Sequence, residues 1–285
     1  MKEMIDPDVR TVQDGRPESE WCRLGHSSWS RYAPEVAEER FLRGPGKRFR
    51  DLRRGLHIFF EFTRGFRTFA SLPPTVTVFG SARFGEETPY YGLARDMARR
   101  LAEEGFAVMT GGGPGIMEAA NRGASEVGGT SVGCNITLPS EQRPNPYVDP
   151  WIEFRHFFVR KVMLVKYSYA FVALPGGFGT LDEVFETATL VQTGKVRDFS
   201  LILMGVDYWK PLYDALAATL LAKEAIAAED LQRLVMTDDV EDAVGCIREC
   251  ARRRFGVDVS RNRAKASGRV VGRHVPRGSG PLGDL

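Results

Sequence analysis

Between residues 75 and 255 the chain alternates short apolar runs with longer amphipathic segments, and this alternation restricts the possible folds strongly. The apolar runs predict strands at Thr75–Phe79, Phe106–Thr110, Ser131–Ile136, Ala170–Leu174, Leu201–Met204 and Leu234–Thr237. The amphipathic segments predict helices at Tyr90–Glu104, Gly115–Glu126, Phe157–Tyr169, Leu181–Gln192, Tyr208–Leu220 and Val240–Arg254. Alternating strands and helices form a parallel sheet with helices on both faces. We therefore expect an α/β protein with a Rossmann-like, doubly wound parallel sheet.

Two segments flank this predicted domain of residues 73–255. Residues 1–72 are expected to form an N-terminal extension that ends in an amphipathic helix at Phe49–Phe69, before Pro73 and Pro74. The apolar face of that helix is expected to dock on the main domain, with a membrane or a partner as the alternative. Residues 256–285 form a basic tail that we expect to be disordered, and nucleic-acid binding is the less favoured interpretation.

The composition is that of an ordinary globular protein, with 43% hydrophobic residues, 27% charged residues and a net charge of +2. The sequence has no run of about 18 apolar residues, the length that a membrane span needs. Residues 1–10 are rich in charge and do not resemble a signal peptide. We therefore expect a cytoplasmic protein that does not bind membranes, and nucleic-acid binding is disfavoured.

Two glycine-containing loops follow the first two predicted strands, at the edge of the sheet where such folds bind ligands. In the first, Phe79-Gly80-Ser81-Ala82-Arg83, the Ser81 hydroxyl is a candidate ligand contact. The second, Thr110-Gly111-Gly112-Gly113-Pro114-Gly115, offers backbone N–H groups to a phosphate, with Gly113 among them. It departs from GxGxxG, and the third strand ends in Asn135 rather than an acidic residue, so NAD binding is disfavoured. A tight turn for helix packing is the alternative.

The third loop, Leu174-Pro175-Gly176-Gly177-Phe178-Gly179-Thr180-Leu181-Asp182-Glu183, is the most specific. Its glycines are expected to donate N–H groups to a phosphate, while Thr180 is expected both to cap the following helix and to hydrogen-bond the phosphate. Glu183 is expected in the first helical turn, either in a capping box or as a carboxylate beside a bound sugar phosphate. Arg160 and Lys161 precede this loop on the previous helix. They supply cationic charge or form a solvated helix face.

These motifs together resemble the LONELY GUY (LOG) family, whose members are cytokinin riboside 5′-monophosphate phosphoribohydrolases often mislabelled as lysine decarboxylases. The resemblance rests on Gly-Gly-Gly-Pro-Gly-Ile-Met-Glu at 111–118, Arg160-Lys161, and Pro-Gly-Gly-Phe-Gly-Thr-Leu-Asp-Glu at 175–183. It implies a Rossmann-like fold, a homodimer or a dimer of dimers, and no metal or organic cofactor. The long N-terminal extension and the basic tail resemble the longer bacterial branch of the family.

By this resemblance, Arg160 and Glu183 match the catalytic pair of the family. The candidate substrate-binding residues are Ser81, Gly113, Glu141, Lys161, Gly176, Gly177, Phe178, Gly179, Thr180, Asp182 and Thr189. Both catalytic candidates are expected at a solvent-facing loop edge.

The predicted reaction is cleavage of the N-glycosidic bond of AMP or N6-modified AMP, which releases the free base and ribose 5-phosphate. A carboxylate near the anomeric carbon stabilises the oxocarbenium-like transition state or activates water. The alternative from another class is a non-catalytic nucleotide- or molybdenum-cofactor-binding carrier, which has no need of the Arg160 and Glu183 pair. Lysine decarboxylation is disfavoured because no lysine of the sequence carries a recognisable pyridoxal phosphate motif.

Overall fold

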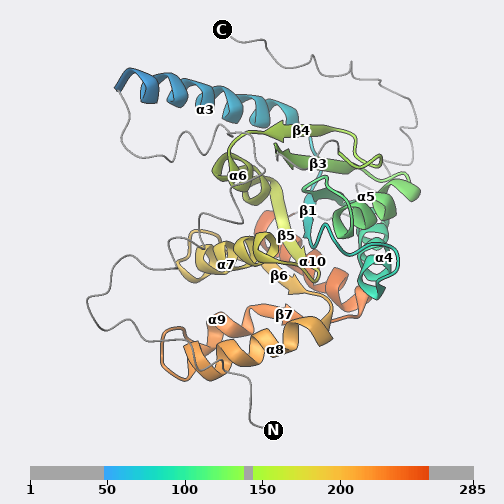
Figure 1. Ribbon diagram of the computed structural model, residues 1–285. Helices are drawn as coiled ribbons and strands as arrows, with labels where there is room; N and C mark the ends of the chain where they lie inside the picture. Colours follow the sequence, from blue (N-terminus) through green and yellow to red (C-terminus); the bar gives the residue numbers. More distant parts are fainter. Residues whose placement is uncertain (1–47, 138–143, 257–285) are drawn as a thin grey trace, which may run out of the picture.

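The computed structural model describes residues 48–137 and 144–256. Within these residues, seven strands form one parallel sheet in the order β4-β3-β2-β1-β5-β6-β7 (Figure 1). In chain order the strands are β1 (Thr75–Phe79), β2 (Ala107–Thr110), β3 (Ser131–Ile136), β4 (Trp151–Phe154), β5 (Ser168–Ala173), β6 (Ser200–Leu203) and β7 (Leu234–Met236). The structure confirms the predicted doubly wound fold.

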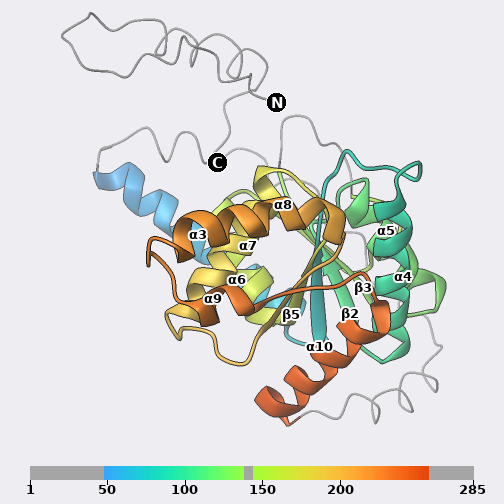
Figure 2. The same ribbon diagram turned by 90° about the horizontal axis from the view of Figure 1, so that it is seen from below.

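Helices cover both faces of the sheet, as Figure 2 shows. One layer contains α4 (Pro89–Glu103), α5 (Ile116–Glu126) and α10 (Val240–Phe255). The other contains α3 (Arg48–Phe69), α6 (Phe157–Tyr167), α7 (Phe178–Gln192), α8 (Val206–Leu216), which continues as the π-helical turn Ala217–Leu221, and α9 (Ala228–Gln232). Each layer buries its own hydrophobic cluster against one face of the sheet.

The central strands β1 and β5 are buried on both faces, which explains why neither contains a charged residue. Along β5, Ala170 and Val172 pack under α4 and α10, whereas Phe171 and Ala173 pack under the opposite layer. The strand order reverses between β1 and β5, because β2, β3 and β4 extend to one side and β6 and β7 to the other. A crevice at such a switch point is the usual ligand site of open α/β sheets.

The observed elements differ from the predicted ones in a few places. The bounds of β1 and β3 are as predicted, and the other predicted strands agree within two residues. The sequence analysis missed β4, a four-residue edge strand that follows Pro144, Pro146 and Pro150, and the five-residue helix α9. Both elements are too short to show a periodic spacing of apolar residues.

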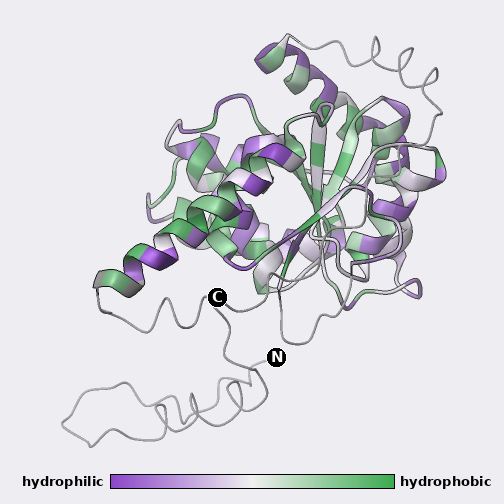
Figure 3. Ribbon diagram, turned by 90° about the horizontal axis from the view of Figure 1, so that it is seen from above, coloured by the Kyte–Doolittle hydropathy of each residue, from purple (hydrophilic) through white to green (hydrophobic). Residues whose placement is uncertain are grey.

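The predicted N-terminal helix is present as α3, but its apolar face docks only in part. Phe69 and Gly65, near its C-terminal end, are buried against the main domain. Near the N-terminal end, Phe49 is 78% exposed and Leu52 is 65% exposed. Figure 3 shows this half of α3 extending beyond the other helices of its layer.

The division of the chain at residues 72 and 255 stays a prediction. The helix α10 ends at Phe255 and is followed by Gly256 in the left-handed conformation, φ 60°. The remainder of the predicted basic tail, like most of the N-terminal extension, lies outside the described residues. Across the two described ranges, no helix combines the length and apolar character needed to cross a membrane.

Candidate active site

Three loops meet where the carboxyl ends of β1 and β5 lie side by side. The Ser81 N–H donates to the Pro175 carbonyl oxygen at 3.0 Å, which joins the first glycine loop to the third. The Ser81 carbonyl oxygen accepts from the Ile116 N–H at 3.0 Å, which joins it to the start of α5. The three sequence motifs therefore converge on one site, and Ser81 lies between the other two.

The third loop approaches its neighbours too closely for any side chain at Gly176. A Cβ there would collide with the Thr180 hydroxyl and would lie 3.1 Å from the Ser81 nitrogen. The Tyr208 hydroxyl, at the start of α8, donates to the Gly176 carbonyl oxygen at 2.9 Å. The sequence analysis missed Tyr208, since a tyrosine 32 residues downstream carries no signal that it contacts this loop.

The helix after this loop begins earlier than predicted, and this changes the interpretation of two residues. The first residue of α7 is Phe178, and Gly177 is the N-cap without any side-chain cap. The predicted capping roles of Thr180 and Glu183 are therefore wrong. Because a glycine N-cap leaves the N–H groups of the first turn without a side-chain acceptor, this end of α7 is suited to an anion.

Glu183 lies in the second turn of α7 and is only 3% exposed, so its predicted solvent-facing position is wrong. Among the described residues, its Oε2 atom has no hydrogen-bond partner. Burial raises the pKa of this carboxyl group to about 7, against the opposing charges of Arg160 and Lys161. A buried carboxyl group with an unpartnered oxygen is costly, and such groups gather at functional sites.

Arg160 connects three elements around this carboxyl group. It lies on α6, and its Nε donates to the Cys134 carbonyl oxygen of β3 at 2.8 Å. Its guanidinium group also packs against Gly111, where a Cβ would collide with Nη2. The second glycine loop thus makes room for the guanidinium group. Arg160 and Glu183 interact electrostatically, so the structure brings the predicted pair together.

Lys161 is held by acidic residues of the neighbouring helix. Its Nζ lies 2.8 Å from the Asp182 carboxylate and 3.0 Å from Glu186 Oε2, so α6 and α7 are linked beside the site. Lys161 and Asp182 were both predicted to contact the nucleotide. In the structure they contact each other, and their proposed role toward a ligand stays a prediction.

A buried polar network supports the second glycine loop. Asn145 Nδ2 donates to the Gly113 carbonyl oxygen at 3.0 Å and to Asn121 Oδ1 at 2.9 Å. Thr110 Oγ1 donates to the same Asn121 oxygen and accepts from the Gly112 N–H at 2.8 Å. The sequence analysis missed this network, whose members come from a strand, a helix and a distant loop. Asn135, at the end of β3, is also buried at the site, and its Oδ1 has no partner among the described residues.

The remaining predicted residues are three at the start of α7, one further along α7, and Glu141. Gly177, Gly179 and Phe178 are exposed at the start of α7, Phe178 at 83%. Thr189 is exposed further along α7, where its hydroxyl donates to the Phe185 carbonyl oxygen at 2.8 Å. Glu141 lies outside the described residues. The roles assigned to these residues stay predictions.

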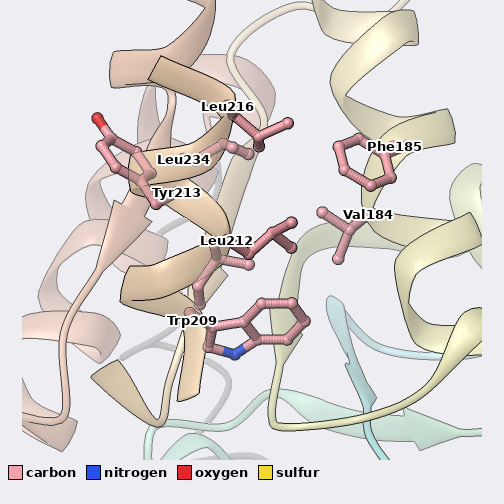
Figure 4. Close-up of a pocket in the computed structure, with 8 residues that line it drawn as sticks. Val184, Phe185, Trp209, Leu212, Tyr213, Leu216 and Leu234 are labelled. Atoms are coloured by element: carbon pink, nitrogen blue, oxygen red, sulfur yellow. The ribbon is translucent and has the colours of Figure 1, made fainter. Parts of the chain in front are cut away.

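An apolar crevice lies between α7 and α8, as Figure 4 shows. Its lining is almost entirely hydrocarbon and includes Val184, Phe185 and Trp209. The indole Nε1 of Trp209 donates to two backbone carbonyl oxygens, Ala173 at 3.1 Å and Met204 at 3.0 Å. The crevice therefore offers no polar groups suited to a phosphate, and the glycine loops remain the candidate site.

The fold and the site together define an α/β protein with three glycine loops at the switch point of its sheet, beside Arg160 and the buried carboxyl group of Glu183. A family model described as "Possible lysine decarboxylase" matches residues 117–247. A cytokinin riboside 5′-monophosphate phosphoribohydrolase from Rhodococcoides fascians is 29% identical over 180 residues, 62% of this chain and 90% of that protein. A protein of the same name from Mycobacterium tuberculosis is 32% identical over 164 residues, 56% of this chain and 84% of that protein. The chain belongs to the family of these relatives, the LOG family.

Among solved structures, a molybdenum cofactor binding protein from Rippkaea orientalis is similar to this chain. It is 25% identical, and the alignment covers 63% of this chain and 98% of that chain with a TM-score of 0.45.

Proposed function

We propose that this protein hydrolyses the N-glycosidic bond of a purine nucleoside 5′-monophosphate, AMP or N6-modified AMP, to free base and ribose 5-phosphate. The observation that carries the proposal is the buried Glu183 carboxyl group, with a raised pKa and an unpartnered oxygen, beside Arg160. The names of the relatives, phosphoribohydrolases of cytokinin riboside 5′-monophosphates, support the same reaction.

The phosphate is bound at the start of α7. Gly177 and Gly179 are exposed there, so backbone N–H groups can reach a ligand without obstruction from side chains. The helix dipole adds partial positive charge at the same end. Binding the phosphate here places the ribose near the second turn of the helix, where Glu183 lies, and this contributes orientation to the reaction.

Cleavage then proceeds through a transition state with positive charge on the ribose. The C1′–N9 bond breaks, its electron pair leaves with the base, and the base takes up a proton. Water adds to C1′, while the ionised Glu183 carboxylate stabilises the charge or accepts the proton of that water. The planar Arg160 guanidinium group can bind in a bidentate fork and orients both the ribose phosphate and the carboxylate.

The test compares AMP, N6-isopentenyl-AMP, GMP and CMP side by side for released base, with adenosine and ATP as controls. We expect one or both of the adenine monophosphates to react, and adenosine to be poor because it lacks the phosphate group. ATP should also be poor, since a site closed around one phosphate excludes two more. Comparable kcat/KM values for AMP and adenosine would refute the phosphate assignment. Tight nucleotide binding without any release of base would favour the non-catalytic carrier.

The proposal includes the assembly of the protein. A homodimer, or a dimer of dimers, with the site near the subunit boundary fits the apolar residues that α6 and α7 expose, among them Val162 at 44% and Phe185 at 39%. Cytoplasmic location is part of the same proposal.

A further inference from the structure

The helix that carries Arg160 is poorly stabilised by its own sequence. α6 has 11 residues, and its N-cap, His156, makes no side-chain cap hydrogen bond. Helices of this length are marginal without tertiary packing. The position of Arg160 therefore depends on what contacts α6 from outside.

The C-terminal half of α3 packs along α6. At Gly65, a Cβ would lie 2.9 Å from the Sδ and Cε atoms of Met163, so the two helices approach closely one turn beyond Arg160. Further along, the rings of Phe69 and Tyr167 meet edge to face with centroids 5.5 Å apart. This half of the N-terminal extension thus supports α6 over much of its length.

Glu61 of α3 holds the start of α6. Its carboxylate accepts a hydrogen bond from the Arg155 N–H, and its Oε2 lies 2.5 Å from His156 Nδ1. The Glu61 side chain is only 13% exposed and that of His156 only 7%. A hydrogen bond to a carboxylate in such a shielded position is stronger than one on the open surface.

This contact connects directly to the candidate active site. The His156 carbonyl oxygen accepts from the Arg160 N–H at 3.2 Å, which closes the first turn of α6. The Arg160 side chain then reaches the Cys134 carbonyl oxygen on the other side. Glu61 therefore fixes one end of the backbone segment whose other end presents the guanidinium group.

We propose that Glu61 is a positioning residue: it holds the start of α6 so that Arg160 lies beside Glu183. The inference rests on the proposed function for its catalytic consequence. In this proposal, α3 of the N-terminal extension contributes to catalysis by positioning Arg160, although no atom of α3 has to contact the substrate.

A positioning role predicts an electrostatic effect that a purely structural role does not. The charged groups that act on Glu183 are Arg160 and Lys161 from α6, and Glu186 and Asp182 from α7. Burial raises the pKa of Glu183 while the two cations lower it. If the start of α6 moves, the Arg160 charge moves away from the carboxyl group and the pKa of Glu183 rises further. The acidic limb of the pH–rate profile then moves to higher pH.

The experiment uses the full-length chain with Glu61→Ala, Glu61→Gln and the matched control Asp51→Ala. Asp51 is an exposed carboxylate of the same helix, paired only loosely with Arg54 at 3.8 Å. We expect Glu61→Ala to lower kcat by roughly 10- to 100-fold, the range for a small misplacement of a catalytic group. KM should change by less than about threefold, because the phosphate loop is intact. Asp51→Ala should match the wild type.

Glu61→Gln tests the geometry of the contact. Its amide oxygen accepts from the Arg155 N–H, and its amide nitrogen donates to His156 Nδ1 once the imidazole proton moves to Nε2, so both contacts are kept and activity should recover substantially. If Glu61→Ala does not fold, Glu61→Asp replaces it. The aspartate keeps the charge but is one methylene too short to reach His156, so it should lower kcat and move the acidic limb in the same direction. A folded Glu61→Ala or Glu61→Asp variant with wild-type kcat and an unmoved acidic limb would overturn the inference.

A second readout does not depend on activity. Hydrogen exchange of the backbone amides of residues 155–160 should be faster in Glu61→Ala than in Asp51→Ala. Equal exchange in these two variants would also overturn the inference. Wild-type protein that releases no base from any nucleotide would instead refute the proposed function, while the exchange measurement would still decide whether Glu61 fixes α6.

Discussion

At the scale of single residues, the Glu183 carboxyl group links activity to stability. Its pKa is raised from 4.5 to about 7, chiefly by burial. Because the folded state holds its proton more tightly than the unfolded state, stability should fall as the pH rises through this interval. The shift corresponds to roughly 3 kcal/mol at most. The Glu183→Gln variant, which cannot ionise, should therefore melt several degrees above the wild type at pH 8 and together with it at pH 4.5.

The same substitution should lower turnover by roughly 10²–10⁴-fold, the range for a positioned acid–base group. In the wild type, kcat/KM should decline as the pH falls below about 7, because protonation removes the active carboxylate. That limb should be absent from the residual activity of Glu183→Gln. Arg160→Ala is the companion variant and should lose activity in the same range. Near wild-type turnover in either variant would show that the assigned pair is wrong.

At the scale of structural elements, the third glycine loop depends on α8. Tyr208→Phe removes the hydroxyl that donates to the Gly176 carbonyl oxygen and leaves the ring in place. A single hydrogen bond contributes about 1 kcal/mol, so KM for AMP should rise by roughly fivefold while kcat changes little. Tyr213→Phe is the matched control, because Tyr213 lies on the same helix but lines the apolar crevice. The measurement is steady-state kinetics with AMP for both variants. Equal KM values for the two variants would mean that Tyr208 does not support the phosphate loop.

The elements also show which parts of this structure the sequence could predict. The strands β1 and β3 were predictable with their bounds because each is a short run without charged residues that lies between turn-forming residues. The start of α7 was not, since Thr180 offers a good capping side chain and the glycine N-cap offers no signal. The contact between Glu61 and His156, which are 95 residues apart, could not be predicted either. As with Tyr208, nothing in the local sequence signals a contact with so distant a residue. Sequence patterns report local periods, whereas these contacts depend on how distant elements pack.

At the scale of the whole molecule, the exposed apolar residues of the α6–α7 layer are the basis for the predicted dimer. The sequence of α6, FFVRKVMLVKY, is largely apolar. The structure divides these apolar residues: Met163 and Leu164 are fully buried in the core, whereas Val162 is 44% exposed and Phe157 is 40% exposed. On α7, Phe185 is 39% exposed. Exposed apolar side chains gathered in one layer are typical of an interaction surface.

A substitution in this surface should separate the subunits if a second copy covers it. In an isologous dimer each residue of the interface occurs twice, so Val162→Glu places two charges in an apolar contact. Light scattering at micromolar concentration should give the wild type at least twice the monomer mass of 31.8 kDa, and Val162→Glu a mass nearer to one subunit. Val127→Glu is the matched control, since Val127 is 39% exposed but follows α5 on the opposite face of the sheet. It should keep the wild-type mass. A wild-type mass near 31.8 kDa would contradict the homodimer, and dissociation by Val127→Glu alone would place the interface on the other layer.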